Sequence, residues 1–209
     1  MSLKSLDLTL QVLVDPMQLD LKDLLPFCQT LRTGGATVVQ LRGKHSSGLE
    51  LFRYGMAFRD ATRQTGLGLV VDDRADVAVA VGADGVHVGQ DDLPLDAIRQ
   101  FAPDLAIGLS VGTYDELTTA RSLRPDYIGM GPIYPTLSKL DAGSTLGIKG
   151  FQALCREAHT VAPVIAIGGI QASNVGPVWR AGANGIAVIS AVMSASDRAA
   201  ACRLLLQSR

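Results

Sequence analysis

The most constraining feature of the chain is a series of short apolar runs, separated by longer segments of helical periodicity. Nearly every position within a run is apolar, as in V-I-A-I at 164–167, and the runs end at Asp, Gly, Ser or Pro. Strands that are apolar without alternation are typical of a parallel sheet buried on both faces. The eight predicted strands cover approximately residues 10–15, 37–42, 67–73, 85–89, 106–111, 127–131, 164–168 and 185–190.

Eight alternating strand and helix units in 209 residues predict an α/β protein with one domain, a (β/α)8 TIM barrel over residues 1–209. One helix signal between the strands is the T-x-x-E capping box of Thr113 and Glu116. An open doubly wound sheet is the alternative, because it also alternates strands with helices. Residues 1–8 are predicted to be an N-terminal extension or a tag remnant.

Two short strings resemble each other, G-A-D-G-V at 82–86 and G-A-N-G-I at 182–186. Each is predicted to end a helix at its first glycine and to begin a buried strand. We interpret the likeness as shared turn chemistry and not as an internal duplication.

Composition excludes several classes of function. The chain has 19 Lys and Arg against 20 Asp and Glu, so it carries no net field that would attract nucleic acid or an acidic membrane. No apolar run approaches the ~18 residues of a membrane span. Cys28, Cys155 and Cys202 are far apart in predicted helices, which indicates buried free thiols in the cytoplasm. Apolar faces on several predicted outer helices permit a homo-oligomer.

A phosphate site is predicted after the seventh and eighth strands. The seventh strand ends in Gly168 and Gly169, the eighth ends in Ile189 and Ser190, and a helical segment follows each. Glycine lets a phosphate approach bare backbone N–H groups, and a helix N-terminus adds its dipole. In barrels of this class the same two loops are the usual phosphate site. Two tight turns without a ligand are the structural alternative.

A second anion site is predicted after the second, third and fourth strands. Strand alternation places Gln40, Arg42 and Lys44 on one side, and Asp73 and Asp92 follow the next two strands. Two carboxylates suit Mg2+, which also takes water and phosphate oxygens as ligands. Two cations with a metal ion suggest a diphosphate. The alternative is a salt-bridge network in which Arg42 pairs with Asp73.

Residues 134–147 form the longest irregular stretch between predicted elements. The stretch is too long for a plain connection, so we predict a mobile active-site loop. It contains Lys139, which would reach a bound diphosphate if the loop closes over the site.

Several strings, taken in chain order, resemble the thiamine phosphate synthase family of the thiazole tautomerase superfamily. The most specific are G-A-D-G-V-H-V-G-Q-D-D-L at 82–93 and G-P-I-Y-P-T at 131–136. The others are V-Q-L-R-G-K at 39–44, D-D-R at 72–74, G-L-S at 108–110, D-Y-I-G-M at 126–130, A-I-G-G-I at 166–170 and G-A-N-G-I-A-V-I-S at 182–190.

The resemblance implies a transferase of a pyrimidinylmethyl group with small-molecule substrates and Mg2+ as cofactor. It would couple 4-amino-2-methyl-5-hydroxymethylpyrimidine diphosphate to 4-methyl-5-(2-phosphoethyl)thiazole, giving thiamine phosphate and pyrophosphate. Asp73 and Asp92 would then hold Mg2+. The resemblance further implies that the pyrimidine diphosphate is bound by Gln40, Arg42, Lys44, Asp72, Ser110, Ser138 and Lys139, and the thiazole phosphate by Thr136, Gly169, Ile189 and Ser190. Of these residues, Arg42, Lys44, Ser110 and Lys139 would assist the reaction itself.

The chain departs from the family pattern at three positions. Asp72 stands where the family usually has Asn, which adds a negative charge beside Asp73 and a polyanionic substrate. Gly112 replaces a common His and Ser138 replaces the usual Thr, and we expect both changes to be tolerated. His87 matches the family string but lies within a predicted strand, where we expect a packed, hydrogen-bonded histidine.

Two other functions remain open from the sequence. A thiazole tautomerase of the same superfamily would bind the thiazole phosphate and move a proton by acid-base chemistry. Such enzymes typically lack the metal aspartates and the P-x-x-x-T pattern, both of which this chain has. A non-catalytic regulator that binds a thiazole or thiamine phosphate is the other alternative, and Asp72 is the one feature that favours it.

Overall fold

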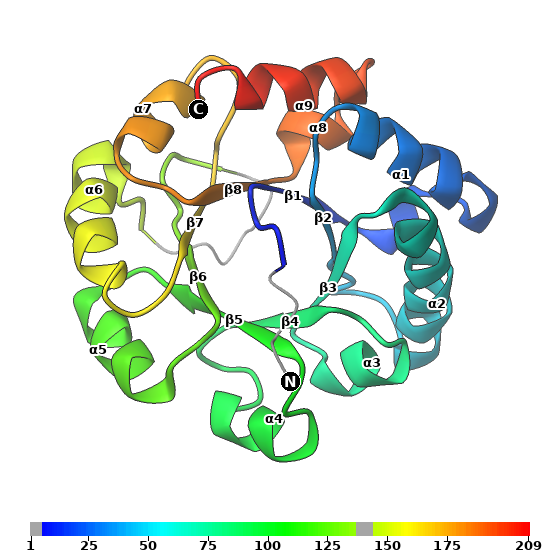
Figure 1. The fold of residues 1–209 in the computed structure, drawn as a ribbon, viewed down its shortest axis with the longest axis horizontal. Helices are drawn as coiled ribbons and strands as arrows, with labels where there is room; N and C mark the ends of the chain where they lie inside the picture. Colours follow the sequence, from blue (N-terminus) through cyan, green and yellow to red (C-terminus); the bar gives the residue numbers. More distant parts are fainter. Residues whose placement is uncertain (1–5, 137–143) are drawn as a thin grey trace.

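Eight parallel strands close into a barrel in the computed structural model, which describes residues 6–136 and 144–209 (Figure 1). Each strand pairs with its neighbours in chain order, and β8 returns to pair with β1. The strands are β1 (Leu10–Val14), β2 (Val38–Leu41), β3 (Gly68–Asp72), β4 (Gly85–Val88), β5 (Ala106–Val111), β6 (Tyr127–Met130), β7 (Val164–Ile167) and β8 (Gly185–Val188). Closure confirms the predicted (β/α)8 barrel and excludes the open sheet, and the predicted strands differ from the observed ones only at their ends.

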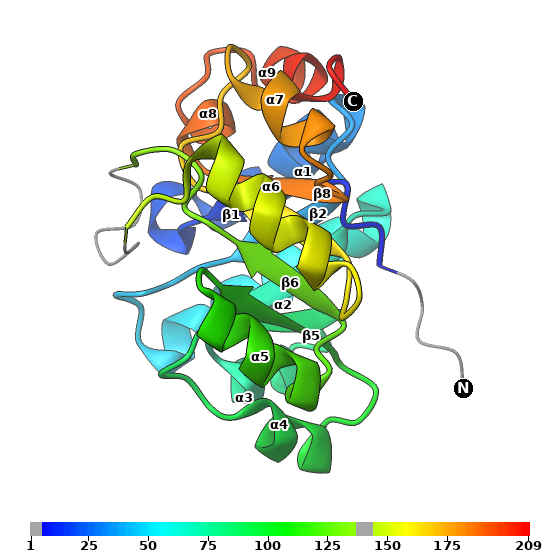
Figure 2. The ribbon, with the colours of Figure 1, turned by 90° about the vertical axis from the view of Figure 1, so that its left-hand side faces the viewer.

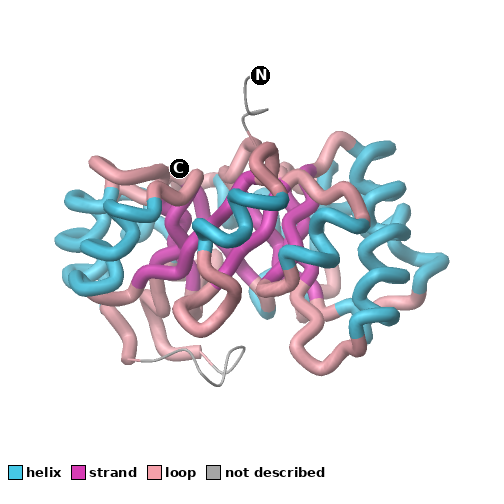
Figure 3. The backbone as a smooth tube through the Cα atoms, turned by 90° about the horizontal axis from the view of Figure 1, so that it is seen from below, coloured by secondary structure: helices cyan, strands magenta, loops and turns pink. Residues whose placement is uncertain are grey.

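Helices form a ring around the strands (Figure 1), and connecting loops lie at the two ends of the barrel (Figures 2 and 3). Thr113 caps α5 in the predicted capping box with Glu116. Within the described ranges, no helix combines the length and hydropathy needed to cross a bilayer. The helices are the 3-10 turns η1 (Pro16–Gln18) and η2 (Leu21–Asp23), then α1 (Leu24–Thr33), α2 (Gly48–Thr65), α3 (Ala75–Ala80), α4 (Leu95–Phe101), α5 (Tyr114–Leu123), α6 (Gly147–Ala158), α7 (Val175–Arg180), α8 (Ser190–Met193) and α9 (Arg198–Leu206).

The apolar core has two parts. A large cluster fills the layer between the strands and the surrounding helices, and it includes the buried free thiols of Cys28, Cys155 and Cys202 on α1, α6 and α9. A small cluster inside the barrel consists of Leu13, Tyr127, Ile165 and Ala187. Leu8, within the predicted N-terminal extension, packs against this inner cluster, so that end of the extension contributes to the core.

Four equivalent hydrogen-bond pairs, which we call the strand-start pairs, join the strands where they begin. In each pair, the residue just before an even-numbered strand donates its backbone N–H to a carbonyl at the start of the preceding strand. The side-chain oxygen of the residue before the even-numbered strand accepts a hydrogen bond from the backbone N–H at the start of the preceding strand. Both hydrogen bonds therefore link the same two residues. The pairs are Thr37 with Leu10, Asp84 with Leu69, Asp126 with Ile107 and Asn184 with Val164, at donor–acceptor distances of 2.7–3.0 Å.

Only two of the strand-start pairs lie in the similar strings at 82–86 and 182–186. Thr37 and Asp126 make the same two bonds in segments that lack the string. What recurs is therefore the hydrogen-bond geometry, since a buried strand start needs an acceptor for its N–H group.

Candidate active site

Polar side chains from β2 and β3 meet at the carboxyl ends of these strands. The Gln40 Nε2 donates to the Asp72 Oδ1 at 2.7 Å, and both side chains are buried. The Arg42 Nε lies 3.2 Å from the Asp72 Oδ2. A carboxylate that is only 9% exposed needs partners of this kind, since desolvation otherwise disfavours its charge. Asp72 thus contacts two of the groups predicted to bind a diphosphate.

Asp73 pairs with Lys44 beside this group. The Lys44 Nζ lies 2.6 Å from the Asp73 Oδ2. Asp73 immediately follows β3 and has a φ of 63°, a left-handed conformation that Asp tolerates better than most residues, and its N–H donates to the His87 carbonyl at 2.8 Å. This turn ends the strand and directs consecutive carboxylates to different partners.

The observed pairing corrects one alternative from the sequence. A salt bridge between Arg42 and Asp73 was the expected form of a purely structural network, whereas Arg42 pairs with Asp72 and Lys44 pairs with Asp73. The reason is register: β2 pairs with β3 as far as Leu41 opposite Val71, and one further step brings Arg42 beside Asp72.

Electrostatic crowding perturbs the pKa values of Asp73 and Lys44. Burial raises the pKa of Asp73, and the carboxylates of Asp72 and Asp92 raise it further against the lowering effect of the Lys44 hydrogen bond. Burial lowers the pKa of Lys44, but its hydrogen bond to Asp73 and the charges of Asp73 and Asp72 outweigh this effect and raise it. A further cation near Asp73 would relieve the repulsion among the carboxylates.

Asp92 follows β4 and interacts electrostatically with Asp73. Its Oδ2 accepts the Gly89 N–H at 2.7 Å, which fixes the carboxylate next to the strand end. Within residues 6–136 and 144–209, no group of three or more His, Cys, Asp and Glu side chains is arranged to hold a metal. Two carboxylates suffice for Mg2+ when water and phosphate oxygens complete its shell. Asp73 and Asp92 therefore suit a magnesium ion whose remaining ligands are water and the phosphate oxygens of a substrate.

Ser110 lies in β5 and contacts a histidine inside the barrel. The His87 Nε2 lies 3.0 Å from the Ser110 Oγ, and the His87 Nδ1 lies 3.2 Å from the Tyr127 hydroxyl. The Gln90 Nε2 donates to the Ser110 carbonyl at 2.7 Å. His87 is thus a packed, hydrogen-bonded histidine, as its position in a strand predicts. Sequence reasoning missed its contact with a candidate site residue, although strand alternation already places both side chains inside.

Glycines shape the loop after β7. Gly168 and Gly169 have φ values of 101° and 65°, which residues with a side chain rarely adopt. A Cβ on Gly169 would lie 2.6 Å from the Pro135 carbonyl oxygen, so the loop also needs glycine for space. The backbone of this loop consequently stays bare, as a phosphate site requires.

The loop after β8 lies beside the β7 loop. The one-turn helix α8 begins at Ser190, directly after Ile189, and the first amides of a helix have no acceptor within it. The Gln171 Nε2 lies 3.5 Å from the Ser190 Oγ and connects the two loops. The contact brings the loop that holds Gly169 near the loop that holds Ile189 and Ser190, and a phosphate site between them stays a prediction.

Asn174 supports the glycine loop and was not predicted from the sequence. Its Nδ2 donates to the Gly169 carbonyl at 3.0 Å and its Oδ1 accepts the Gln171 N–H at 2.8 Å. The Tyr134 hydroxyl donates to the Asn174 carbonyl at 3.0 Å, which links the β6 loop to the β7 loop. An Asn a few residues after a Gly-Gly turn is a weak signal for this role.

Three predicted residues lie at or beyond the edge of the described chain. Thr136 follows β6 and is partly buried. Ser138 and Lys139 lie outside the described residues, as does half of the predicted loop at 134–147.

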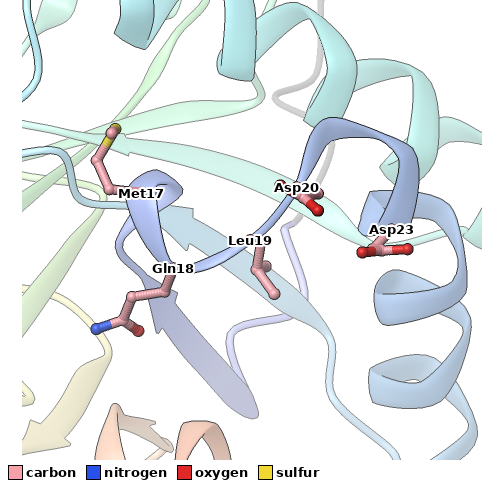
Figure 4. A pocket seen from close by; sticks show the side chains of 5 residues that line it. All are labelled: Met17, Gln18, Leu19, Asp20 and Asp23. Carbon is pink, nitrogen blue, oxygen red and sulfur yellow. The ribbon is translucent and has the colours of Figure 1, made fainter.

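A surface pocket is lined by a different set of residues. It is formed by the segment between β1 and α1, and Figure 4 shows its lining side chains, Met17, Gln18, Leu19, Asp20 and Asp23. None of the residues predicted to bind substrate or metal lines it, so we do not assign the reaction to this pocket.

The closed barrel with polar side chains gathered at the carboxyl ends of its strands defines a (β/α)8-barrel protein of the kind that binds its ligands at that end. The sequence profile of a family described as thiamine monophosphate synthase matches residues 10–192. The chain belongs to this family.

Individual relatives agree with the family match. The thiamine-phosphate synthase of Chloroflexus aurantiacus is 46% identical over 172 residues, which cover 82% of this chain and 79% of the relative. That of Azorhizobium caulinodans is 43% identical over 95% of this chain and 93% of its own. The solved structure of a thiamine phosphate pyrophosphorylase from Pyrococcus furiosus superposes with a TM-score of 0.84 at 38% identity, and covers 97% of this chain and 96% of that one.

Proposed function

We propose that the chain is a Mg2+-dependent thiamine phosphate synthase that acts at the carboxyl end of the barrel. It couples hydroxymethylpyrimidine diphosphate to thiazole phosphate and releases pyrophosphate. The observation that carries the proposal is a group of charges in a chain of this family: Arg42 pairs with Asp72, Lys44 pairs with Asp73, and Asp92 interacts electrostatically with Asp73. A diphosphate is the substrate group that uses both cations and a shared metal ion.

Gln40, Arg42, Lys44 and Ser110 bind the diphosphate in this proposal. Arg42 presents a planar fork of donors to phosphate oxygens, whereas Lys44 supplies a compact charge. Lys139 adds a third cation. Ser138 would contact the same diphosphate, and Asp72 holds Gln40 and Arg42.

Asp73 and Asp92 would hold the Mg2+ ion, which would supply positive charge to the diphosphate oxygens. Burial raises the pKa of Asp73 and the neighbouring carboxylates of Asp72 and Asp92 raise it further, and a divalent cation would offset the repulsion among these carboxylates. Lys44 approaches the Asp73 Oδ2 at 2.6 Å and holds that carboxylate in place for the ion.

The thiazole phosphate is bound by Thr136, Gly169, Ile189 and Ser190, the last three largely through backbone donors. The bond to the diphosphate breaks first, and the thiazole nitrogen captures the pyrimidine cation. Catalysis then consists of stabilising the departing negative charge and of aligning two bound fragments, and both effects are available to fixed cations and amides.

The direct test is to incubate the protein with both fragments and Mg2+ and to measure thiamine phosphate and pyrophosphate. Formation of both products supports the proposal. Tautomerisation of a thiazole carboxylate phosphate without coupling would show a thiazole tautomerase instead. Binding of thiazole phosphate without turnover would show a regulator.

The metal assignment has a separate test in Asp92→Ala. We expect this variant to lose Mg2+-dependent coupling by at least ~100-fold while its circular dichroism is unchanged, because a carboxylate at the rim contributes little to the core. Asp91→Ala is the matched control, since Asp91 is the exposed neighbour. Normal turnover of Asp92→Ala would show that the metal is held elsewhere.

The domain organisation, cellular compartment and oligomeric state belong to the same proposal. We propose that residues 1–209 form one domain that acts on small molecules in the cytoplasm, without nucleic acid or a membrane. The three buried free thiols suit a reducing compartment. A homo-oligomer is compatible with the exposed apolar side chains of Leu49, Phe52 and Met56 on α2, and sedimentation would determine it.

A further inference from the structure

His87 connects the candidate site residue Ser110 to the buried Tyr127. The two contacts, at 3.0 Å and 3.2 Å, use the two ring nitrogens of the same imidazole. In a neutral imidazole one nitrogen donates a hydrogen bond and the other accepts one. Whichever nitrogen carries the proton therefore fixes whether Ser110 receives a hydrogen bond from His87 or donates one to it.

Tyr127 determines which nitrogen carries that proton. Its side chain is fully buried, and among the described residues its hydroxyl has one hydrogen-bond partner, the His87 Nδ1. Burial raises the pKa of Tyr127, and the charges of Asp72 and Asp126 raise it further, so the hydroxyl keeps its proton. A buried O–H group needs an acceptor. The His87 Nδ1 is then the acceptor, and the Nε2 carries the ring proton.

We propose that Tyr127 and His87 position Ser110 as a hydrogen-bond donor to the substrate. Tyr127 donates to the His87 Nδ1, the Nε2–H donates to the Ser110 Oγ, and the Ser110 hydroxyl proton is directed to an anionic oxygen at the barrel mouth. His87 and Tyr127 are positioning residues, because they act through Ser110. The inference rests on the proposed function for the identity of that anion, a diphosphate.

Two glycines provide the space for this arrangement. A Cβ on Gly108 would lie 2.1 Å from the Tyr127 Cζ and 2.5 Å from the His87 Nδ1, and a Cβ on Gly129 would lie 2.7 Å from the His87 Cε1. In the sheet register, Gly108 lies opposite both His87 and Tyr127, and Gly129 lies opposite Ser110. Any larger residue at either glycine would displace a ring, so the two positions keep the imidazole between its two partners.

The tautomer can be measured on the protein alone by nitrogen NMR of histidine-labelled protein. At about pH 8, above the ordinary histidine pKa of about 6.5, we expect the His87 proton on Nε2. In Tyr127→Phe the Nδ1 loses its donor, and we expect the form with the proton on Nδ1 to become detectable. Tyr114→Phe is the control, because Tyr114 is exposed on α5. A proton on Nδ1 in the unmodified protein would overturn the proposal.

The link to Ser110 is tested by a double-mutant cycle on binding of magnesium pyrophosphate, measured by calorimetry. We expect Ser110→Ala to weaken binding by ~10-fold or more, as for a lost hydrogen bond to a charged group, and Tyr127→Phe to weaken it by about threefold. If Tyr127 acts through Ser110, adding Tyr127→Phe to Ser110→Ala has no further effect. Multiplicative losses in the double variant would overturn the proposal. Failure of the unmodified protein to make thiamine phosphate would instead refute the proposed function, since the tautomer is read without substrate.

Discussion

Asp72 is one of the three residues described above that depart from the family pattern. Its carboxylate contacts Gln40 and Arg42, two groups assigned to the diphosphate, and raises the pKa of Asp73. Asp72 therefore both orders the site in the absence of substrate and repels the substrate's charge. Which effect is larger can be measured with an isosteric change.

We expect Asp72→Asn to tighten binding of magnesium pyrophosphate by about three- to tenfold, which corresponds to about 1 kcal/mol. The amide oxygen can still accept the Gln40 hydrogen bond, whereas the negative charge beside the diphosphate is removed. Calorimetric titration measures the change, with Asp76→Asn on the exposed start of α3 as the control. Weaker binding would show that Asp72 acts mainly by holding Arg42.

The same substitution is expected to lower the pKa of Asp73. Burial and two neighbouring carboxylates raise this pKa above the usual aspartate value of about 3.9, and Asp72→Asn removes one of the two charges. Carbon NMR of the carboxyl groups as a function of pH measures both values. An unchanged pKa in the variant would mean that the two carboxylates do not interact.

The raised pKa of Asp73 also sets the sign of its pH dependence. Because the folded protein binds this proton more tightly than the unfolded chain, the contribution of Asp73 to stability is full below its unfolded pKa. That contribution is lost as pH rises through its raised folded pKa. Protonation competes with Mg2+, so metal affinity is expected to fall, as pH decreases, at a higher pH than for an ordinary aspartate. Calorimetric titration of Mg2+ from about pH 7 to about pH 4.5 measures it.

At the scale of elements, the strands could be predicted from the sequence, but the ion pairs between side chains at the carboxyl ends of the strands could not. Continuous apolar runs mark strands buried on both faces, and the capping box at Thr113 marks a helix start, because both depend on neighbours in sequence. Pairing of Arg42 with Asp72 instead of Asp73 depends on register and on the left-handed turn at Asp73, which no local pattern specifies.

The strand-start pairs are expected to stabilise the barrel. Asp126 accepts the Ile107 N–H and forms an ion pair with Arg99, and both side chains are partly buried. Asp126→Ala leaves the N–H without an acceptor and should lower the free energy of unfolding by about 2–3 kcal/mol. Asp126→Asn keeps an acceptor and should lose less. Urea denaturation measures both, and equal losses would assign the effect to the ion pair alone.

At the scale of the whole molecule, the fold could be predicted because eight similar units leave few ways to close a sheet. The candidate site was predicted in outline, since polar residues after successive strands converge at one end of the barrel. The His87 contacts with Ser110 and Tyr127 needed three strands in register and two glycines across the barrel. Sequence spacing alone does not predict which side chains contact each other inside a closed barrel.

Burial of all three thiols predicts a property of the intact molecule. Burial raises the pKa of Cys28 to about 12 and those of Cys155 and Cys202 to about 11, so thiolate is scarce near neutral pH. We expect no reaction with a thiol reagent such as Ellman's reagent in the folded protein and three equivalents after denaturation. Rapid labelling of the native protein would indicate local opening of α1, α6 or α9.

The strand-start pairs lie at the end of the barrel from which the strands begin, away from the polar residues at their carboxyl ends. Assembly of the barrel and recognition of ligands thus depend on separate sets of side chains. Selection for a different substrate can change the residues at the carboxyl ends of the strands, while the strand-start pairs at the opposite end still stabilise the fold. A laboratory library confined to the carboxyl-end loops should accordingly retain a high share of folded members.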